Sequence, residues 1–482
     1  MLRKIITLIM CAALVLSVAS CGESNEVASD KIRVTMSFWE PGVNQEFETA
    51  FKEIITEYNK VRPDVQIELI SQPYDGYQQW ITSQFSANSA PIIEYNHSAT
   101  LADQFRNGLL LDLREVLSQP NKYAGDEAWA DTFIDGRLDP ANNYTSDRFS
   151  IPIQGMGLAF FYNKAVYDEL GLTPPATWDE FMANCAKIAE TPTNPIALMG
   201  MKDDAIDWLA QYITTGLFGN YILADDKINF NGDTALDDKE IVRAIKEGHF
   251  DITTGEYNKM YKKLLDMVAE YSEYTKDAVG LDEVGAKAQF VGGKAAHIMS
   301  GSWDIPEFIN NDERDFEVSA FPFPKFTKDN YEHAGGSMVV IGVQPFAITS
   351  KAKENPEVEE AAKDFLQFMT APANYKIFVE RTLSIPVVKD VDVDSIFTSF
   401  TEGTRPPLFL FVLNSKLAAF NGKDAVKQVL SGKKDGFDDM AKKQQESIDM
   451  WADESIERFG ISAETNYDTD SVSMIGVFDP EN

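Results

Sequence analysis

The chain has 482 residues, a formal net charge of −33, and 44% hydrophobic residues. This acidic excess argues against nucleic acid or an anionic lipid surface as a partner, because binding either one requires Lys and Arg to neutralise phosphate. The length exceeds what one hydrophobic core usually holds, about 250–300 residues, so we expect two domains.

The first 20 residues are typical of an export signal. Two basic residues precede an apolar run over residues 5–16, which is shorter than the roughly 20 residues that a membrane-spanning helix needs. The following Val18-Ala19-Ser20-Cys21 resembles the lipobox of bacterial lipoproteins. That resemblance implies that residues 1–20 are removed and that Cys21 carries lipid. The alternative is an ordinary secretory signal with a chance cysteine. Residues 21–30 are polar and predict a flexible tether.

Hydrophobic periodicity predicts a β-α-β unit at the start of the body. Residues 31–39 and 65–69 alternate apolar and polar side chains as strands do, and residues 47–58 between them carry apolar side chains at helical spacing. The connection predicts that the two strands lie parallel in one sheet. Ile92-Ile93 predicts a further short strand.

The middle of the chain is expected to be mostly helical. Thr177 and Glu180 have the spacing of a capping box, and Pro356 suits the first position of another helix. Cys185 falls on the apolar face of the helix that begins after Thr177, which predicts a buried, inert thiol. Strands are expected at 295–299 and 338–349.

Four stretches carry a family resemblance. They are residues 34–39, residues 91–93 with 107–110, residues 151–181, and residues 290–303. The third is the most specific, with Phe161-Tyr162-Asn163-Lys164 followed by Pro174-Pro175-Ala176-Thr177-Trp178-Asp179-Glu180-Phe181. In this order they resemble extracellular solute-binding protein family 1, the group around maltose-binding protein. Ile92 departs from the Asp that the family often has there, and insertions are expected over 121–147 and after 378.

The resemblance implies an α/β, two-lobed periplasmic-binding-protein fold of type II-like topology with several hinge crossings. It implies that residues 31–150 plus 292–322 form the first lobe. Residues 151–291 plus 323–482 would form the second. Composition alone shows no boundary between them.

Most candidate ligand-binding residues follow predicted strands, because ligands in open α/β sheets lie beyond the carboxyl ends of the strands. An indole covers the apolar face of a sugar ring, while acids and amides match its hydroxyls. The structural alternatives are a core position for each Trp, a helix cap or solvated loop for the polar residues, and a hinge for the glycines. The candidates after strands are Trp39, Glu40, Asn96, Trp303 and Asp304. The others are Trp208, on a helix face, and Gly336 and Ser337, where a Gly-Gly-Ser segment could bring the backbone close to a ligand.

The resemblance implies the substrate-binding component of an ABC importer, which captures a sugar or oligosaccharide and passes it to permease subunits. It implies a monomer, lipid-anchored at the outer face of the cell membrane or facing the periplasm, and no enzyme activity, cofactor or metal. The sequence contains no His-Glu-x-x-His or Gly-x-Ser-x-Gly motif. Two alternatives stay open: a binding protein for a peptide, polyamine or other solute, and a glycan-capture lipoprotein without transport. The identity, length and linkage of the ligand are not specified by the sequence.

Overall fold

A computed structural model describes residues 31–40, 46–134, 137–138, 148–200, 203–233, 236–275, 280–312, 314–335, 341–391 and 423–471. The predicted signal, the tether and Cys21 lie outside these ranges. Within them, we find no helix that combines the length and the apolar character needed to cross a membrane.

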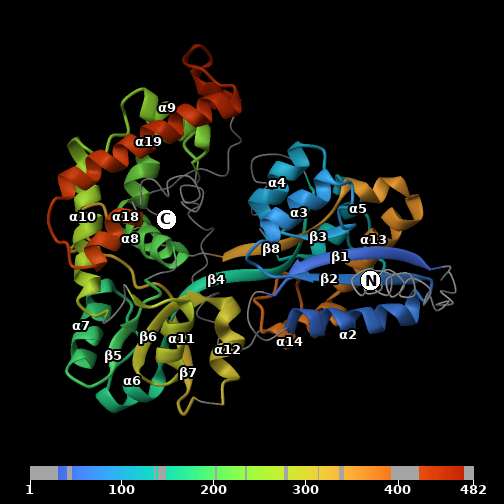
Figure 1. Cartoon of the computed structure of the whole chain (residues 1–482), viewed down its shortest axis with the longest axis horizontal. Helices are drawn as coiled ribbons and strands as arrows, with labels where there is room; N and C mark the ends of the chain where they lie inside the picture. Colours follow the sequence, from blue (N-terminus) through green and yellow to red (C-terminus); the bar gives the residue numbers. More distant parts are fainter. Residues whose placement is uncertain are drawn as a thin grey trace, which may run out of the picture.

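The protein consists of two α/β lobes joined by one long strand, β4 (Ile151–Asn163), which Figure 1 shows running from one lobe into the other. The first half of β4 pairs antiparallel with β8 (Ile341–Ile348), and its second half pairs antiparallel with β6 (Ala295–Gly301) and β7 (Val318–Phe321). The strand order is β2-β1-β3-β8-β4-β6-β5, with β7 beside β4. This arrangement confirms the predicted fold class.

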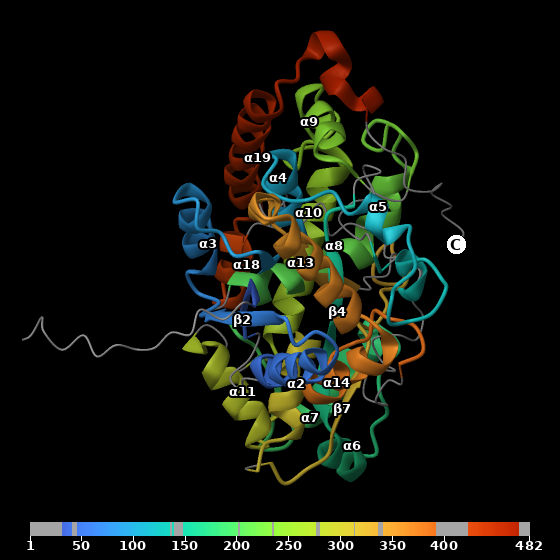
Figure 2. The ribbon, with the colours of Figure 1, turned by 90° about the vertical axis from the view of Figure 1, so that its right-hand side faces the viewer.

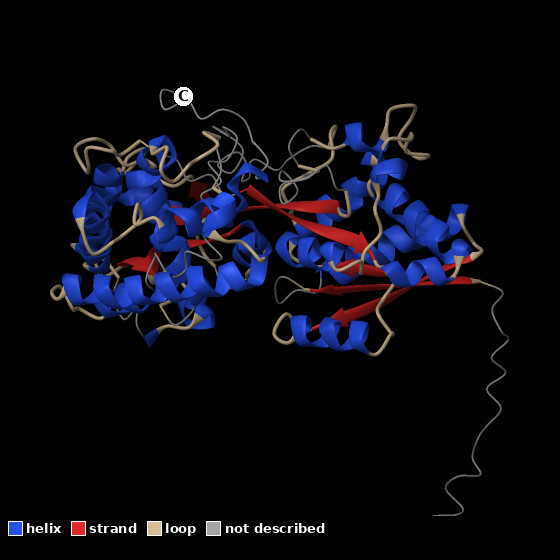
Figure 3. Ribbon diagram, turned by 90° about the horizontal axis from the view of Figure 1, so that it is seen from above, coloured by secondary structure: helices blue, strands red, loops and turns tan. Residues whose placement is uncertain are grey.

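The first lobe is built on the predicted β-α-β unit. β1 (Ile32–Trp39) pairs parallel with β2 (Val65–Gln72) in register Ile32–Val65, and with β3 (Ile93–Tyr95) on its other side. Figure 3 shows helices on both sides of these strands. The helices of this lobe are α2 (Glu46–Val61), α3 (Tyr77–Ser86), α4 (Ser98–Arg106), α5 (Arg114–Leu117), η1 (Trp129–Thr132), η4 (Ser350–Glu354), α13 (Pro356–Met369) and α14 (Pro372–Thr382).

The second lobe combines the far half of β4 with β5 (Asn194–Ala197), β6 and β7 and with most of the helices. The helices are α6 (Lys164–Leu170), α7 (Trp178–Ala189), α8 (Asp203–Ala224), α9 (Asp238–Lys246), α10 (Gly255–Ser272), α11 (Glu283–Val291), η3 (Ser302–Asp304), α12 (Ile305–Ile309), α18 (Lys423–Leu430), α19 (Phe437–Phe459) and η6 (Ala463–Ser471). The C-terminal helices α18, α19 and η6 pack on α8, α9 and α10, and Figure 2 shows α19 as a long helix along this lobe.

The lobes have separate hydrophobic cores, and these divide the chain differently from the predicted boundaries. β6 is buried along its whole length and pairs with β4 and β5, so residues 292–322 belong to the second lobe. β8, α13 and α14 pack in the core of the first lobe, so residues 341–388 belong there. Of the described residues, Ala334 therefore belongs to the second lobe and Val343 to the first, while Val388 belongs to the first lobe and Ala425 to the second.

Local signals in the sequence hold in the structure. The Thr177–Glu180 capping box is formed in both directions at α7, and Pro356 begins α13 with Asn355 as its cap. Cys185 is a buried free thiol, and burial raises the pKa of this group. These features are set by neighbouring residues, which is why the sequence alone predicted them.

Candidate functional site

Five aromatic rings meet where β1 and β3 end in the first lobe. The centroid of Trp39, at the end of β1, lies 5.6 Å from that of Tyr74, 4.8 Å from Tyr77, 4.6 Å from Tyr95 and 5.0 Å from His97. Trp39 is buried, whereas Tyr74 is 53% exposed. We call these five residues the first-lobe aromatic group; Tyr74 and His97 are its accessible members.

A network of buried polar side chains in the interior of the first lobe holds this group in position. The hydroxyls of Tyr77 and Ser37 are 2.8 Å apart. Asn96 is fully buried: its Oδ1 accepts from Gln78 and from the His97 backbone N–H, and its Nδ2 donates to Glu94 at 2.6 Å. All the polar atoms of the Asn96 side chain thus have partners inside the lobe. Its direct contact with a ligand stays a prediction.

Two of the predicted tryptophans come together in the second lobe. Trp208 of α8 and Trp303 of η3 are both half-buried, with ring centroids 5.6 Å apart at an interplanar angle of 62°. The indole of Trp303 lies directly on Gly301, where an added Cβ would be 2.2 Å from the ring. The structure therefore joins residues that are 95 positions apart in the sequence into one aromatic surface, the Trp208–Trp303 pair.

Asp304, next to this pair, forms a buried ion pair. Its Oδ1 accepts from the ammonium of Lys287 at 2.6 Å, and its Oδ2 accepts from Ser300. Lys287 also lies 2.9 Å from Glu283 and 3.2 Å from Glu307. Burial lowers the pKa of Lys287, but the three carboxylates outweigh it and raise that pKa above its ordinary value. Asp304 thus has a partner in its own lobe, and ligand contact by Asp304 stays a prediction.

Asp204, in the first turn of α8, is near enough to the first-lobe aromatic group for its charge to act on Tyr74 and His97. Burial raises the pKa of Tyr74, and the charges of Asp204, Asp75 and Glu283 raise it further. Burial lowers the pKa of His97, while a hydrogen bond from Gln344 and the charge of Asp204 partly offset this effect. Asp204 lies one turn before Trp208 in α8, so the two aromatic surfaces belong to the same interlobe region.

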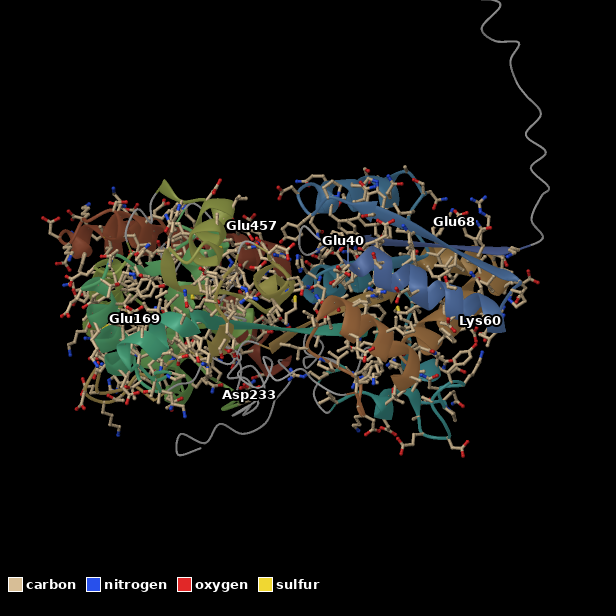
Figure 4. The ribbon with its side chains drawn as sticks, turned by 90° about the horizontal axis from the view of Figure 1, so that it is seen from below. Glu40, Lys60, Glu68, Glu169, Asp233 and Glu457 are labelled. Atoms are coloured by element: carbon tan, nitrogen blue, oxygen red, sulfur yellow. The ribbon has the colours of Figure 1, made fainter. Side chains whose placement is uncertain are left out.

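Glu40 is also at the edge of the first lobe that faces the second, as Figure 4 shows. Its carboxylate accepts the backbone N–H groups of Phe47 and Glu48 at 3.2 and 2.8 Å, at the start of α2. This is the position where a negative charge stabilises a helix. Burial raises the pKa of Glu40. Gly336 and Ser337 lie outside the described residues.

Sequence reasoning missed Tyr74, His97 and Asp204. Tyr74 comes two residues after β2 and His97 two residues after β3. The rule that ligands lie beyond the carboxyl ends of the strands, which we call the strand-end rule, could therefore have found both residues. Asp204 carries no such signal, because its position depends on how α8 is placed against the other lobe.

Comparison with known proteins assigns the chain to a family. Residues 42–376 match the model of the bacterial extracellular solute-binding proteins. The chain belongs to this family. A multiple sugar-binding protein of Streptococcus mutans is 23% identical over 78% of this chain and 80% of its own length. A galactooligosaccharide-binding protein of Bacillus subtilis is 22% identical over 82% of this chain and 83% of its own length.

Solved structures of similar proteins share the two-lobed fold. The solute-binding protein RafE in complex with raffinose aligns with a TM-score of 0.63 and 19% identity, over 87% of this chain and all of the other. A chitin oligosaccharide binding protein aligns with a TM-score of 0.63 and 17% identity, over 88% of this chain and all of the other. The protein is thus an extracellular solute-binding protein, a binding component and not an enzyme.

One group of side chains in this solute-binding protein has metal-ligand chemistry. Among the described residues, ligand atoms of Glu256, Glu332 and His333 lie within 4.8 Å of one another. Glu256 already pairs with Lys259 at 2.8 Å and accepts the Tyr331 hydroxyl at 2.6 Å. Glu256 therefore has partners of its own within the protein, a cation in Lys259 and a hydroxyl in Tyr331.

Proposed function

We propose that this solute-binding protein captures an oligosaccharide between its two lobes and delivers it to the permease of an ABC importer. The carrying observation is the pair of aromatic surfaces in one interlobe region: Trp208 and Trp303 on the second lobe, and Tyr74 with His97 on the first. Aromatic faces cover the apolar faces of sugar rings, and two such surfaces suit a ligand of more than one ring.

The relatives support a saccharide ligand. Besides the two named above, a melibiose/raffinose/stachyose-binding protein of Bacillus subtilis is 21% identical over 79% of this chain. Identities this low leave the linkage and length of the sugar open. Raffinose, galactooligosaccharides, maltotriose and xylotriose make a panel that separates the main classes.

Isothermal titration calorimetry of the purified protein against this panel tests the proposal. We expect one sugar class to bind and Trp303→Ala or Trp208→Ala to weaken that binding, because each removes half of the aromatic pair. Trp451→Ala is the matched control, since Trp451 of α19 packs on a separate small cluster of Val242, Ile461 and Tyr467, which Trp208 and Trp303 do not join. Equal affinity of wild type and Trp303→Ala would exclude this surface as the binding site.

The proposal includes a lipid anchor on Cys21, supported by the lipobox at residues 18–21 and the apolar run before it. In cells fed radiolabelled palmitate, we expect the wild-type protein to be labelled and to sediment with membranes. Cys21→Ala should lose both properties while the fold stays unchanged. Label on the Cys21→Ala variant would contradict the assignment.

A cationic solute is the second candidate, because Asp75, Asp204 and Glu283 all act on Tyr74. An aromatic ring among carboxylates also suits an ammonium group. Spermidine and a basic peptide in the same calorimetric panel separate the two candidates. Binding of these cations without any sugar would replace the saccharide assignment.

A further inference from the structure

Glu94 lies at the centre of the polar network behind the first-lobe aromatic group, at the middle position of β3. Its side chain is fully buried. Oε1 accepts two amide hydrogen bonds, from Asn96 at 2.6 Å and from Gln104 at 2.9 Å. Oε2 is buried and has no hydrogen-bond partner among the described residues. If Glu94 were ionised, its negative charge would be spread over both oxygens, and the charge on Oε2 would have no hydrogen-bond donor to stabilise it.

Among the residues that the structure describes, no cation acts on Glu94: its carboxyl is affected only by burial and by its hydrogen bonds from Asn96 and Gln104. In the sheet it is flanked by Ser37 of β1 and Ala347 of β8. Gln104 of α4 donates a hydrogen bond to Glu94. Tyr77 of α3 is also near, because a charge on Glu94 raises the pKa of the Tyr77 hydroxyl. All these groups are neutral at pH 7. A buried carboxyl without a cation favours its protonated form.

We propose that Glu94 is a positioning residue that holds a proton and thereby sets the placement of Asn96 and His97 at the binding face of the first lobe. In the protonated form, the carbonyl oxygen still accepts both amides and no charge is buried. Asn96 in turn determines the position of His97, because the Asn96 Oδ1 accepts a hydrogen bond from the backbone N–H of His97 at 2.8 Å. The ring of His97 in turn lies 5.0 Å from Trp39 and 6.0 Å from Tyr74.

This assignment makes the binding face sensitive to pH in the neutral range. Burial raises the pKa of Glu94 to about 7. Above that pH, the ionised carboxylate must recruit water or turn toward a donor, and either change disturbs the hydrogen bond to Asn96. Closure of the lobes removes more water, so a bound ligand should favour the protonated form further. The expected effect on ligand affinity rests on the proposed function.

A titration of the ligand-free protein tests the positioning role without any sugar. The ring resonances of His97, assigned through their loss in His97→Gln, are followed by NMR from pH 5 to 9. We expect an inflection near pH 7 in the wild type, separate from the protonation of His97 itself, whose pKa is lowered. Glu94→Gln should abolish this inflection, because the amide keeps the shape of the side chain and cannot ionise.

The matched control is Glu240→Gln. Glu240 is also fully buried, and burial raises its pKa to about 7, but it caps α9 in the second lobe. This variant should keep the inflection of His97. Asn96→Ala, which breaks the link while leaving Glu94 in place, should lose it. Identical His97 titrations in the wild type and Glu94→Gln would overturn the proposal.

The second measurement is the affinity for raffinose by calorimetry at pH 5.5 and 8.5. We expect the wild type and Glu240→Gln to bind more weakly at pH 8.5, by about tenfold for each unit by which the ligand raises the pKa of Glu94. Glu94→Gln should bind equally at both values. If Glu94→Gln loses affinity at pH 8.5 to the same extent as the wild type, the proposed effect on affinity is overturned. If neither raffinose nor any other sugar of the panel binds, the proposed function is contradicted instead. The His97 titration would then still decide the role of Glu94.

Discussion

Lys287 supports the Trp208–Trp303 surface by neutralising the buried carboxylate of Asp304. Lys287→Met would leave Asp304 without its cation, and breaking such a pair costs about 3–5 kcal/mol. We expect this loss in the free energy of unfolding measured with urea. Lys52→Met is the control: its pair with Glu48 is solvent-exposed, so its removal should cost at most about 1 kcal/mol. Equal effects of the two variants would contradict a structural role for the Lys287–Asp304 pair.

Gly301 has its own role at the residue scale, because it leaves room for the indole of Trp303. Gly301→Ala should push the ring away from Trp208, lower stability by about 1–3 kcal/mol and weaken sugar binding. Thermal melting followed by circular dichroism, together with calorimetry, measures both effects. Gly280→Ala is the control, since no atom of the described residues, apart from its direct chain neighbours, lies within 4 Å of a Cβ added there. Unchanged binding by Gly301→Ala would mean that the position of Trp303 is unimportant for the ligand.

The strand-end rule identified positions, but it could not identify partners. It selected Trp39, Asn96 and Trp303 as residues at strand ends, and in the structure they lie at or just after the ends of β1, β3 and β6. It gave no sign that Asn96 would be saturated by Gln78 and Glu94, because those contacts depend on the packing of α3 and on the depth of β3 in the sheet.

At the scale of elements, α13 is tied to its neighbours through Asp364. The buried carboxylate accepts hydrogen bonds from Tyr58 of α2, from Arg62 directly after that helix, and from Lys122 and Tyr123. Burial raises the pKa of Asp364, but these hydrogen bonds and charges outweigh it and hold the pKa below its ordinary value of 3.8. The network therefore stabilises the first lobe only while Asp364 is ionised.

Asp364→Asn should lower the free energy of unfolding by about 3 kcal/mol at pH 7, since it removes the charge that faces Arg62 and Lys122. A lowered pKa gives stability that is present above the unfolded-state pKa and is lost as pH falls through the folded-state value. The difference between the wild type and the variant should thus be constant from pH 7 to about 5 and should shrink below pH 4. Urea unfolding at several pH values measures it, and a difference independent of pH would refute the assignment.

The elements themselves were predictable where their signals are local. The alternation over 31–39, the capping box at Thr177 and the proline at 356 each involve residues within one turn or strand. The lobe to which β6 and β8 belong was predicted wrongly, because strand pairing joins segments more than 100 residues apart, as β4 and β6 do. Periodicity carries no information about such partners.

At the scale of the whole molecule, β4 gives the two lobes a shared strand and thus a hinge about which they can close. The C-terminal helices lie beyond the residues that match the family model, which ends at 376. The end of α19 reaches back toward the first lobe, and Figure 4 shows Glu457 at the edge of the second lobe that faces it. There, Arg458 pairs with Asp103 of α4 at 3.5 Å.

The Arg458–Asp103 pair connects the lobes outside the hinge, so it should bias the ligand-free protein toward the closed form. Both side chains are about half exposed, and such a pair is worth about 0–1 kcal/mol, which shifts the ratio of closed to open molecules by at most about fivefold. Arg458→Ala should therefore increase the radius of gyration measured by small-angle X-ray scattering at low salt. The difference from the wild type should vanish near 1 M salt, where charges are screened within about 3 Å. Lys60→Ala, whose pair with Glu57 lies within α2, should have no effect at either salt concentration. If Arg458→Ala scatters like the wild type at low salt, the C-terminal helices affect closure by packing or not at all, and closure is controlled at the strands that cross between the lobes.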